Sequence, residues 1–201
     1  MTHPLPPIPR PRRCTRQFLA TLLVLLALVL GSWGATLLPT RDEVSEAPFL
    51  RHGDIGEGIR TRLGTVTVTG VRTSARIQRF NQVAASAGLW IVVDLDFVPA
   101  EEVTTLANFQ LKDPMDRTFG GAQVLPAVCG PAQPGFITSC MIHFEVPQES
   151  VPGATLWVRN SRPGFPDDVA VIDLELDSSS QDVDAAADPI VVEEPVTRGQ
   201  P

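Results

Sequence analysis

Residues 89–98 read Leu-Trp-Ile-Val-Val-Asp-Leu-Asp-Phe-Val, and this stretch decides the fold. Every second position from Leu89 to Phe97 is apolar, and Asp94 and Asp96 stand between apolar residues. Successive side chains of a β-strand point to opposite faces of the sheet. The stretch therefore predicts a strand with one face in a hydrophobic core and the other, carboxylate-bearing face toward solvent.

The same alternation recurs on both sides of this strand. Further strand candidates cover residues 64–72, 106–112, 117–125, 136–146, 155–159 and 168–177. Prolines and glycines separate them, and Gly70 is expected to produce a bulge because it puts Val71 out of phase. Only 77–87 is compatible with a helical turn. About seven short strands in this spacing predict an all-β fold, an immunoglobulin-like β-sandwich over residues 61–177.

An apolar run precedes the sandwich. Residues 18–38 contain no charge, and a helix of this length spans about 31 Å, close to the thickness of a bilayer core. The basic residues ahead of the run, Arg10, Arg12, Arg13 and Arg16, should stay in the cytoplasm. The sequence therefore predicts one transmembrane helix, a signal anchor over 18–38, in a single-pass protein of the cell membrane with residues 40–201 on the extracytoplasmic side.

Cleavage of a signal peptide is the alternative. The densest apolar stretch, 18–30, has the length of a secretory core, and Ser32 and Gly34 offer small residues before a cut at Ala35. We favour the anchor because the apolar run continues past that point. Both interpretations place the sandwich outside the cytoplasm.

The remaining segments are polar. Residues 1–17 are rich in proline and arginine and are predicted to be an extended cytoplasmic segment. Residues 39–60 show no apolar period and are interpreted as a linker. Residues 178–201 are interpreted as a disordered acidic tail. Its apolar triplet Ile190–Val192 is compatible with a docking motif, although disorder is the favoured interpretation.

Charge is distributed unevenly along the chain. All 23 acidic residues and 12 of the 16 basic ones follow the apolar run, which gives that part a net charge of −11. A strongly acidic domain lacks the basic face that nucleic-acid phosphates require. Nucleic acid is therefore excluded as an expected partner, and the membrane itself is the first partner predicted.

Two of the three cysteines lie in the predicted sandwich. Cys129 and Cys140 are separated by ten residues that include Gly130-Pro131 and Pro134-Gly135, so the chain can turn back between them. Outside the cytoplasm a disulfide persists, and we favour a Cys129–Cys140 bridge over two buried thiols or a metal site. Cys14 should be cytoplasmic and reduced.

Residues that could carry chemistry are few. His52 lies in the predicted linker and His143 on the outward face of its strand, where an imidazole that is solvated or paired across strands is expected rather than a general base. No nucleophile elbow, zinc-protease motif or phosphate loop occurs. We therefore expect no enzyme: no catalytic residue, cofactor or metal ligand is predicted.

Two side-chain pairs on outward strand faces leave alternatives open. Asp94 with Asp96, and Asp173 with Glu175, could bind Ca²⁺ if their strands were neighbours, but a solvated face is favoured. Trp90 and Val92 share an outward face, and packing under a loop is favoured over an exposed contact patch.

Several stretches also resemble a known family. They are LWIVVDLDF (89–97), FQLKDPMDRTF (109–119), PGFITSC (134–140), HFEVP (143–147) and DDVAVIDLEL (167–176). They are similar to the telokin-like, immunoglobulin-fold family of uncharacterised bacterial envelope proteins, common in actinobacteria. The resemblance covers 61–177 and its motifs are strands and turns. It implies an exported or membrane-tethered sandwich and no particular activity.

These features lead to one expected function and two alternatives. We expect a membrane-tethered, non-catalytic module that binds or scaffolds an envelope protein or cell-wall component through its surface. One alternative is an accessory subunit of a transport or secretion complex, in which the helix contacts a partner through Gly31, Ser32, Gly34 and Ala35. The other is a secreted sandwich released by signal cleavage.

Overall fold

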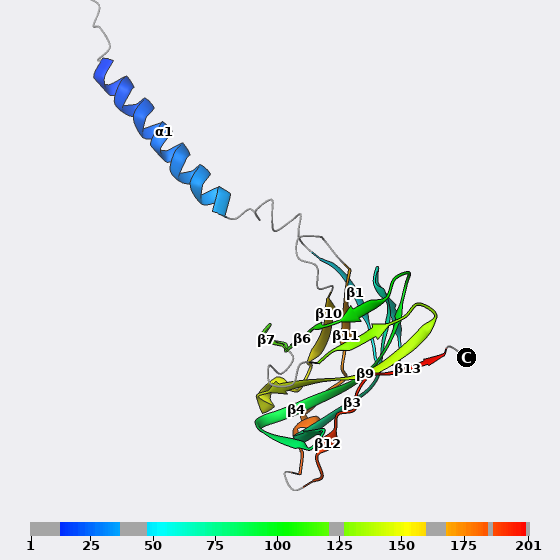
Figure 1. Cartoon of the computed structure of the whole chain (residues 1–201). Helices are drawn as coiled ribbons and strands as arrows, with labels where there is room; N and C mark the ends of the chain where they lie inside the picture. The colour runs from blue at the N-terminus through cyan, green and yellow to red at the C-terminus, as the bar shows by residue number, and fades with distance from the viewer. Residues whose placement is uncertain (1–12, 37–47, 121–126, 160–167, 185–186, 200–201) are drawn as a thin grey trace, which may run out of the picture. The chain divides into compact units, whose positions relative to one another are not determined.

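A computed structural model describes residues 13–36, 48–120, 127–159, 168–184 and 187–199 (Figure 1). The chain divides into two compact units, Met1–Ser45 and Glu46–Pro201. Each unit is described by itself.

The first unit contains the helix α1, Arg13–Thr36. Its segment Gln17–Gly34 has a mean hydropathy of 1.9 and is long and apolar enough to cross a membrane, as predicted. The helix begins within the segment 1–17, so the prediction of an extended chain is wrong for 13–17. The last proline before residues 13–17 is Pro11, and neither proline nor glycine occurs between it and Gly31. The rest of that segment, and residues 37–38 of the predicted anchor, lie outside the described residues.

The second unit is a β-sandwich. The first sheet has the order β1 (Phe49–Gly53), β11 (Asp168–Asp173), β10 (Thr155–Arg159), β6 (Asn108–Lys112) and β7 (Thr118–Gly120). The second sheet has the order β12 (Ile190–Val191), β3 (Gly64–Arg79), β4 (Gln82–Pro99), β9 (Phe136–Val146) and β13 (Val196–Gly199), and β2 (Gly58–Arg60) also pairs with β3. A small separate pair is formed by β5 (Thr104–Leu106) and β8 (Cys129–Ala132), and short 3₁₀ helices occupy Gln148–Ser150 and Ser178–Gln181.

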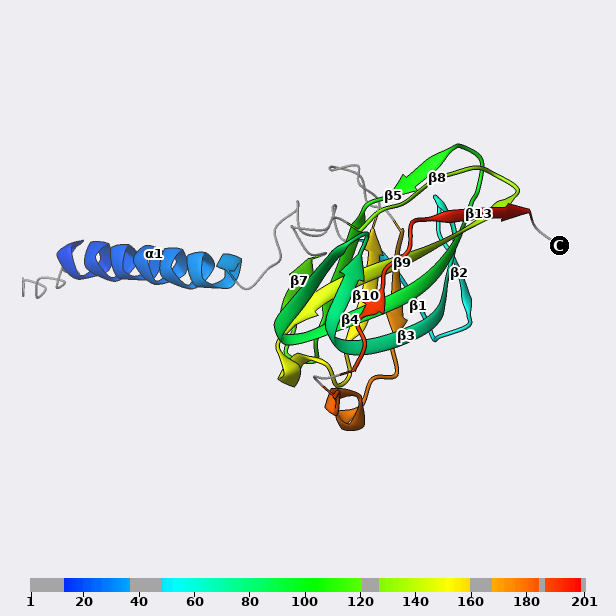
Figure 2. The same ribbon diagram turned by 60° about the horizontal axis from the view of Figure 1, so that its bottom comes forward.

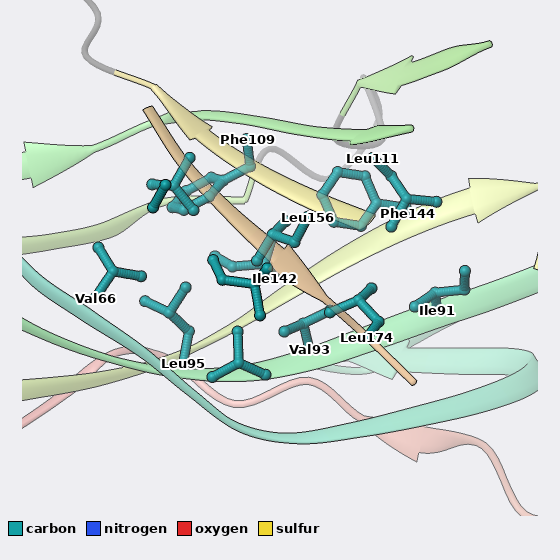
Figure 3. Close-up of a cluster of buried hydrophobic side chains, with 14 of the residues drawn as sticks. Val66, Ile91, Val93, Leu95, Phe109, Leu111, Ile142, Phe144, Leu156 and Leu174 are labelled. Atoms are coloured by element: carbon teal, nitrogen blue, oxygen red, sulfur yellow. The ribbon is translucent and has the colours of Figure 1, made fainter. Parts of the chain in front are cut away.

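The core lies between the two sheets. The alternate apolar residues of 89–97 all point into it, and each is at most 5% exposed, as the alternation predicts. Figure 3 shows Ile91, Val93 and Leu95 among side chains of β6, β9 and β10, which include Leu111, Phe144 and Leu156. The fold prediction of an all-β sandwich after one apolar helix is confirmed.

The strands β3 and β4 form one long hairpin. Arg79 pairs with Gln82, so residues 80 and 81 make the turn, and the segment 77–87, which the sequence left compatible with a helical turn, is strand on both sides of it. The pairing register shifts between Val68 and Gly70, where the bulge was predicted, and again between Ser74 and Arg76. Such shifts bend and twist a hairpin.

Two predicted flexible segments belong to the folded unit. Within the predicted linker 39–60, β1 pairs in parallel with β11 and β2 pairs with β3. Within the predicted tail 178–201, β12 pairs with β3 and β13 pairs with β9. Both predictions are wrong there because these are edge strands, whose backbone hydrogen bonds need no alternation of apolar side chains. Residues 39–47, 185–186 and 200–201 lie outside the described residues.

Candidate binding surface on the second sheet

The outer face of the second sheet, which points away from the first sheet, carries a small hydrophobic cluster of its own. Its buried members are Ile77, Trp90, Val92 and Val192, with Ala84, Met141 and Ile190 packed against them. The predicted packing of Trp90 and Val92 is therefore confirmed. What covers them is the tip half of the β3–β4 hairpin together with residues from the end of the chain.

His143 lies beside this cluster. Its side chain is only 1% exposed, and its ring centroid is 5.9 Å from that of Trp90. Of the two expected states, the solvated imidazole is therefore wrong, and the contact with Trp90 of the neighbouring strand agrees with the cross-strand alternative. The strand alternation places His143 on the outer face as expected, but that face is covered here by residues distant in the sequence.

We call residues 187–199 the strap. At one end, Ile190–Val191 pairs with the edge of β3, and the amide N–H of Val192 donates to the carbonyl of Gln78 at 2.7 Å. At the other end, Val196–Gly199 pairs with the opposite edge of the sheet, β9. The strap therefore crosses the outer face between the two edges, and in Figure 2 the red end of the chain passes over this sheet to β13.

A hollow of about 480 Å³ lies between the strap, β4 and β9. Its walls contain four carboxylates, Asp94 and Asp96 from β4 and Glu193 and Glu194 from the strap. The rest of the lining is polar and apolar and consists of Thr69, Leu95, Ser139, Cys140, Met141, Val196 and Arg198. The strand 89–98, which was predicted to carry Asp94 and Asp96 on its outward face, thus forms the floor of a cavity.

Arginine side chains neutralise the carboxylates of the floor. Nη2 of Arg72 lies 3.0 Å from Oδ1 of Asp94, and Nη2 of Arg198 lies 2.7 Å from Oδ2 of Asp96. Among the described residues, Glu193 and Glu194 take part in no ion pair within 4.0 Å. The hollow therefore keeps a negative charge at its strap side.

A calcium site was expected only if the strands of the two carboxylate pairs were neighbours, and they are not. Asp94 and Asp96 belong to the second sheet, whereas Asp173 ends a strand of the first sheet and Glu175 follows it. Within the described part of the chain, no group of three histidine, cysteine or acidic side chains could hold a metal ion. His52, in β1 of the first sheet, and His143 also lie on different sheets.

The predicted disulfide joins Cys129 of β8 to Cys140 of β9, with their Cα atoms 5.5 Å apart. Both residues are buried in the core. The bridge ties the small β5–β8 pair to the second sheet next to Ser139, which lines the hollow.

A second polar cluster fixes the turn after β6. Oδ1 of Asp113 accepts the amide N–H groups of Met115 and Arg117, at 3.0 and 2.9 Å, and Oδ2 accepts Nε of Arg117 at 2.6 Å. Arg117 also donates to Oγ of Ser150 at 2.8 Å. Burial raises the pKa of Asp113, but these hydrogen bonds and the guanidinium charge outweigh it, so the pKa lies below its ordinary value.

No protein family, no curated protein and no solved structure matches this chain. What it binds must therefore be inferred from its own residues. Sequence reasoning placed Asp94 and Asp96 correctly on an outward face but missed Arg72, Arg198 and the two strap glutamates. The apolar triplet Ile190–Val192 in an acidic segment was the one available signal for the strap.

Proposed function

We propose that this chain is a membrane-tethered, extracytoplasmic, non-catalytic module with an immunoglobulin-like sandwich that binds or scaffolds a partner in the cell envelope. The apolar helix supports the tether, and the arginines before it support a cytoplasmic N-terminal side. The Cys129–Cys140 bridge suits an oxidising compartment.

The hollow on the second sheet is the proposed binding site, and its charge carries the proposal. Glu193 and Glu194 face a cavity whose floor carboxylates are already paired with arginine. A guanidinium or ammonium group of a partner would gain charge-assisted hydrogen bonds there. The partner is therefore proposed to present a basic side chain, and the attraction should weaken with salt.

Capture from native membranes tests this site. The full-length chain is cross-linked in membranes, extracted in detergent and recovered, as wild type and as the double variant Glu193→Gln/Glu194→Gln. We expect partner recovery to fall roughly tenfold, the effect of losing about 1.4 kcal/mol of binding.

The control has the same charge change elsewhere. Glu101→Gln/Glu102→Gln alters an exposed acidic pair in the loop after β4 and should leave recovery unchanged. Equal partner recovery with the two double variants would show that the hollow is not the binding site.

A helix-borne partner is the second candidate function, that of an accessory subunit in a membrane complex. A Cβ atom added at Gly31 or Gly34 would meet nothing within 4 Å, so that side of α1 is open to a neighbouring helix. Gly31→Leu/Gly34→Leu should release an integral-membrane partner if the helix contacts it. A partner that is retained by this variant but lost with the glutamate variant supports the hollow instead.

A further inference from the structure

We propose that β13 exchanges between two copies of this chain, so that Val196–Gly199 of one copy pairs with β9 of the other. The occupant of this sheet edge is then a second copy. The first reason is that the two halves of the strap are held very differently.

The first half of the strap is anchored. Val192 is 5% exposed and belongs to the outer cluster with Trp90 and Val92. The second half is not buried, since all four residues of β13 are exposed. Release of β13 would therefore uncover little apolar surface, whereas release of the first half would open the outer cluster.

Two side-chain contacts nevertheless make the pairing of β13 with this edge of the sheet specific for its sequence. Thr197 lies opposite Thr138, with 3.3 Å between their hydroxyl oxygens, and Arg198 pairs with Asp96 across the hollow. The backbone ladder and these two contacts are local to four residues. They would be the same whichever copy supplied the strand, which is the condition for exchange without loss of native contacts.

The segment between the two halves suits a hinge. Glu193, Glu194 and Pro195 separate Val192 from Val196, and Pro195 has no N–H with which to continue a ladder. The side chains of the two glutamates take part in no ion pair within 4.0 Å among the described residues, so no salt bridge holds this segment against the sheet. An emptied β9 would be an open sheet edge, a template for another strand.

Tethering favours the second copy as the source of that strand, a step that rests on the proposed membrane anchor. Chains held in one bilayer meet at a raised effective concentration. If the anchor is absent, exchange is expected only at high protein concentration, which separates failure of the tether from failure of the exchange.

Cross-linking of two different cysteine variants tests the proposal. Val196 lies opposite Ser139 on the outer face, so full-length Ser139→Cys and Val196→Cys chains, each also carrying Cys14→Ser and a different tag, are co-reconstituted in bilayers and oxidised. We expect a covalent dimer containing both tags, at least roughly tenfold above the control mixture because the strands are held in register. The control replaces Val196→Cys by Met115→Cys, whose side chain is exposed on another loop.

A variant with both cysteines in one chain is the positive control for the cross-link. Ser139→Cys/Val196→Cys in one chain should cross-link within itself and so show that the geometry is competent. If it does while the mixture gives no more dimer than the Met115 control, the proposal is overturned. If the Ser139 variants fail to fold, Phe136→Cys with Gly199→Cys provides the same test at the exposed end of the ladder. Cross-linking of Ser139→Cys in cells to a different protein, with none to its own copy, would also contradict it.

Discussion

At the scale of single residues, Asp113 holds the clearest electrostatic role in the sandwich. Its carboxylate is almost fully buried and is satisfied by Arg117 and two backbone N–H groups. Arg117 in turn reaches Ser150, in the 3₁₀ helix that follows β9. Through Arg117, the carboxylate of Asp113 therefore connects the turn after β6 of the first sheet to the 3₁₀ helix after β9 of the second sheet.

Asp113→Asn should lower the free energy of unfolding by about 1 to 3 kcal/mol, because the N–H groups of Arg117 and Met115 would lose a charged acceptor at a buried site. Urea unfolding measures the change. Asp116→Asn is the matched control, because the Asp116 side chain is 86% exposed and its pair with Lys112 is worth less than about 1 kcal/mol. Equal losses for both variants would contradict the assigned role.

The lowered pKa of Asp113 gives this stabilisation a pH dependence. A carboxyl group whose folded pKa lies below its unfolded value of 3.8 stabilises the fold above that value. The stabilisation is lost as the pH falls through the folded pKa. The stability difference between wild type and Asp113→Asn should therefore be constant near neutral pH and shrink below about pH 4. A difference that stays unchanged down to about pH 2 would contradict the depressed pKa.

The Cys129–Cys140 disulfide is a second contribution of individual side chains to the stability of the sandwich. It closes a loop with a sequence separation of 11, for which chain entropy predicts about 3 kcal/mol of stabilisation. Cys129→Ser/Cys140→Ser should lose about this much in denaturant unfolding. A thiol titration of the wild-type chain, denatured without reductant, should find only Cys14 free. Three free thiols would show that the bridge does not form in the cell.

At the scale of elements, the strap covers part of the outer face of the second sheet. Val192 and Val191 are neighbours on it with opposite environments, at 5% and 53% exposure. The first is part of the outer cluster, and the second points to solvent.

Val192→Asp should therefore destabilise the sandwich by about 2 kcal/mol or more, because it places a charge against Trp90 and Val92. It should also change the fluorescence of Trp90 as water reaches the indole. Val191→Asp, the matched control, should change neither property appreciably. If the two variants behave alike, the strap does not cover this face in solution.

How well each strand could be predicted depends on whether side-chain burial or backbone pairing stabilises it. Strands β9 and β10 were predicted to their ends, and β4 from Leu89 onward, because one face of each is buried in the core, which imposes alternation on the sequence. The edge strands β1, β12 and β13 were missed because backbone pairing leaves no such pattern. The burial of His143 was missed for a different reason. His143 packs against Trp90 of the neighbouring strand β4, and alternation reports only which face a residue occupies, not what packs there.

At the scale of the whole molecule, the chain combines one apolar helix with an acidic, disulfide-bridged sandwich. The order of these parts could be predicted from charge and hydropathy because membrane insertion depends on composition. The hollow could not, because it is formed by strands and a strap that are distant in the sequence. Its two unneutralised glutamates nevertheless come from the segment that composition alone marked as tail.

Protease access in intact cells tests the central claim, that α1 anchors the sandwich on the outer side of the membrane. The chain carries one epitope before Arg10 and another after Gln200, and protease is added to spheroplasts before and after lysis. We predict loss of the second epitope in intact spheroplasts while the first stays protected and sediments with membranes. Protection of both epitopes until lysis, with the chain in the soluble fraction, would contradict the anchor, the compartment and the proposed binding role together.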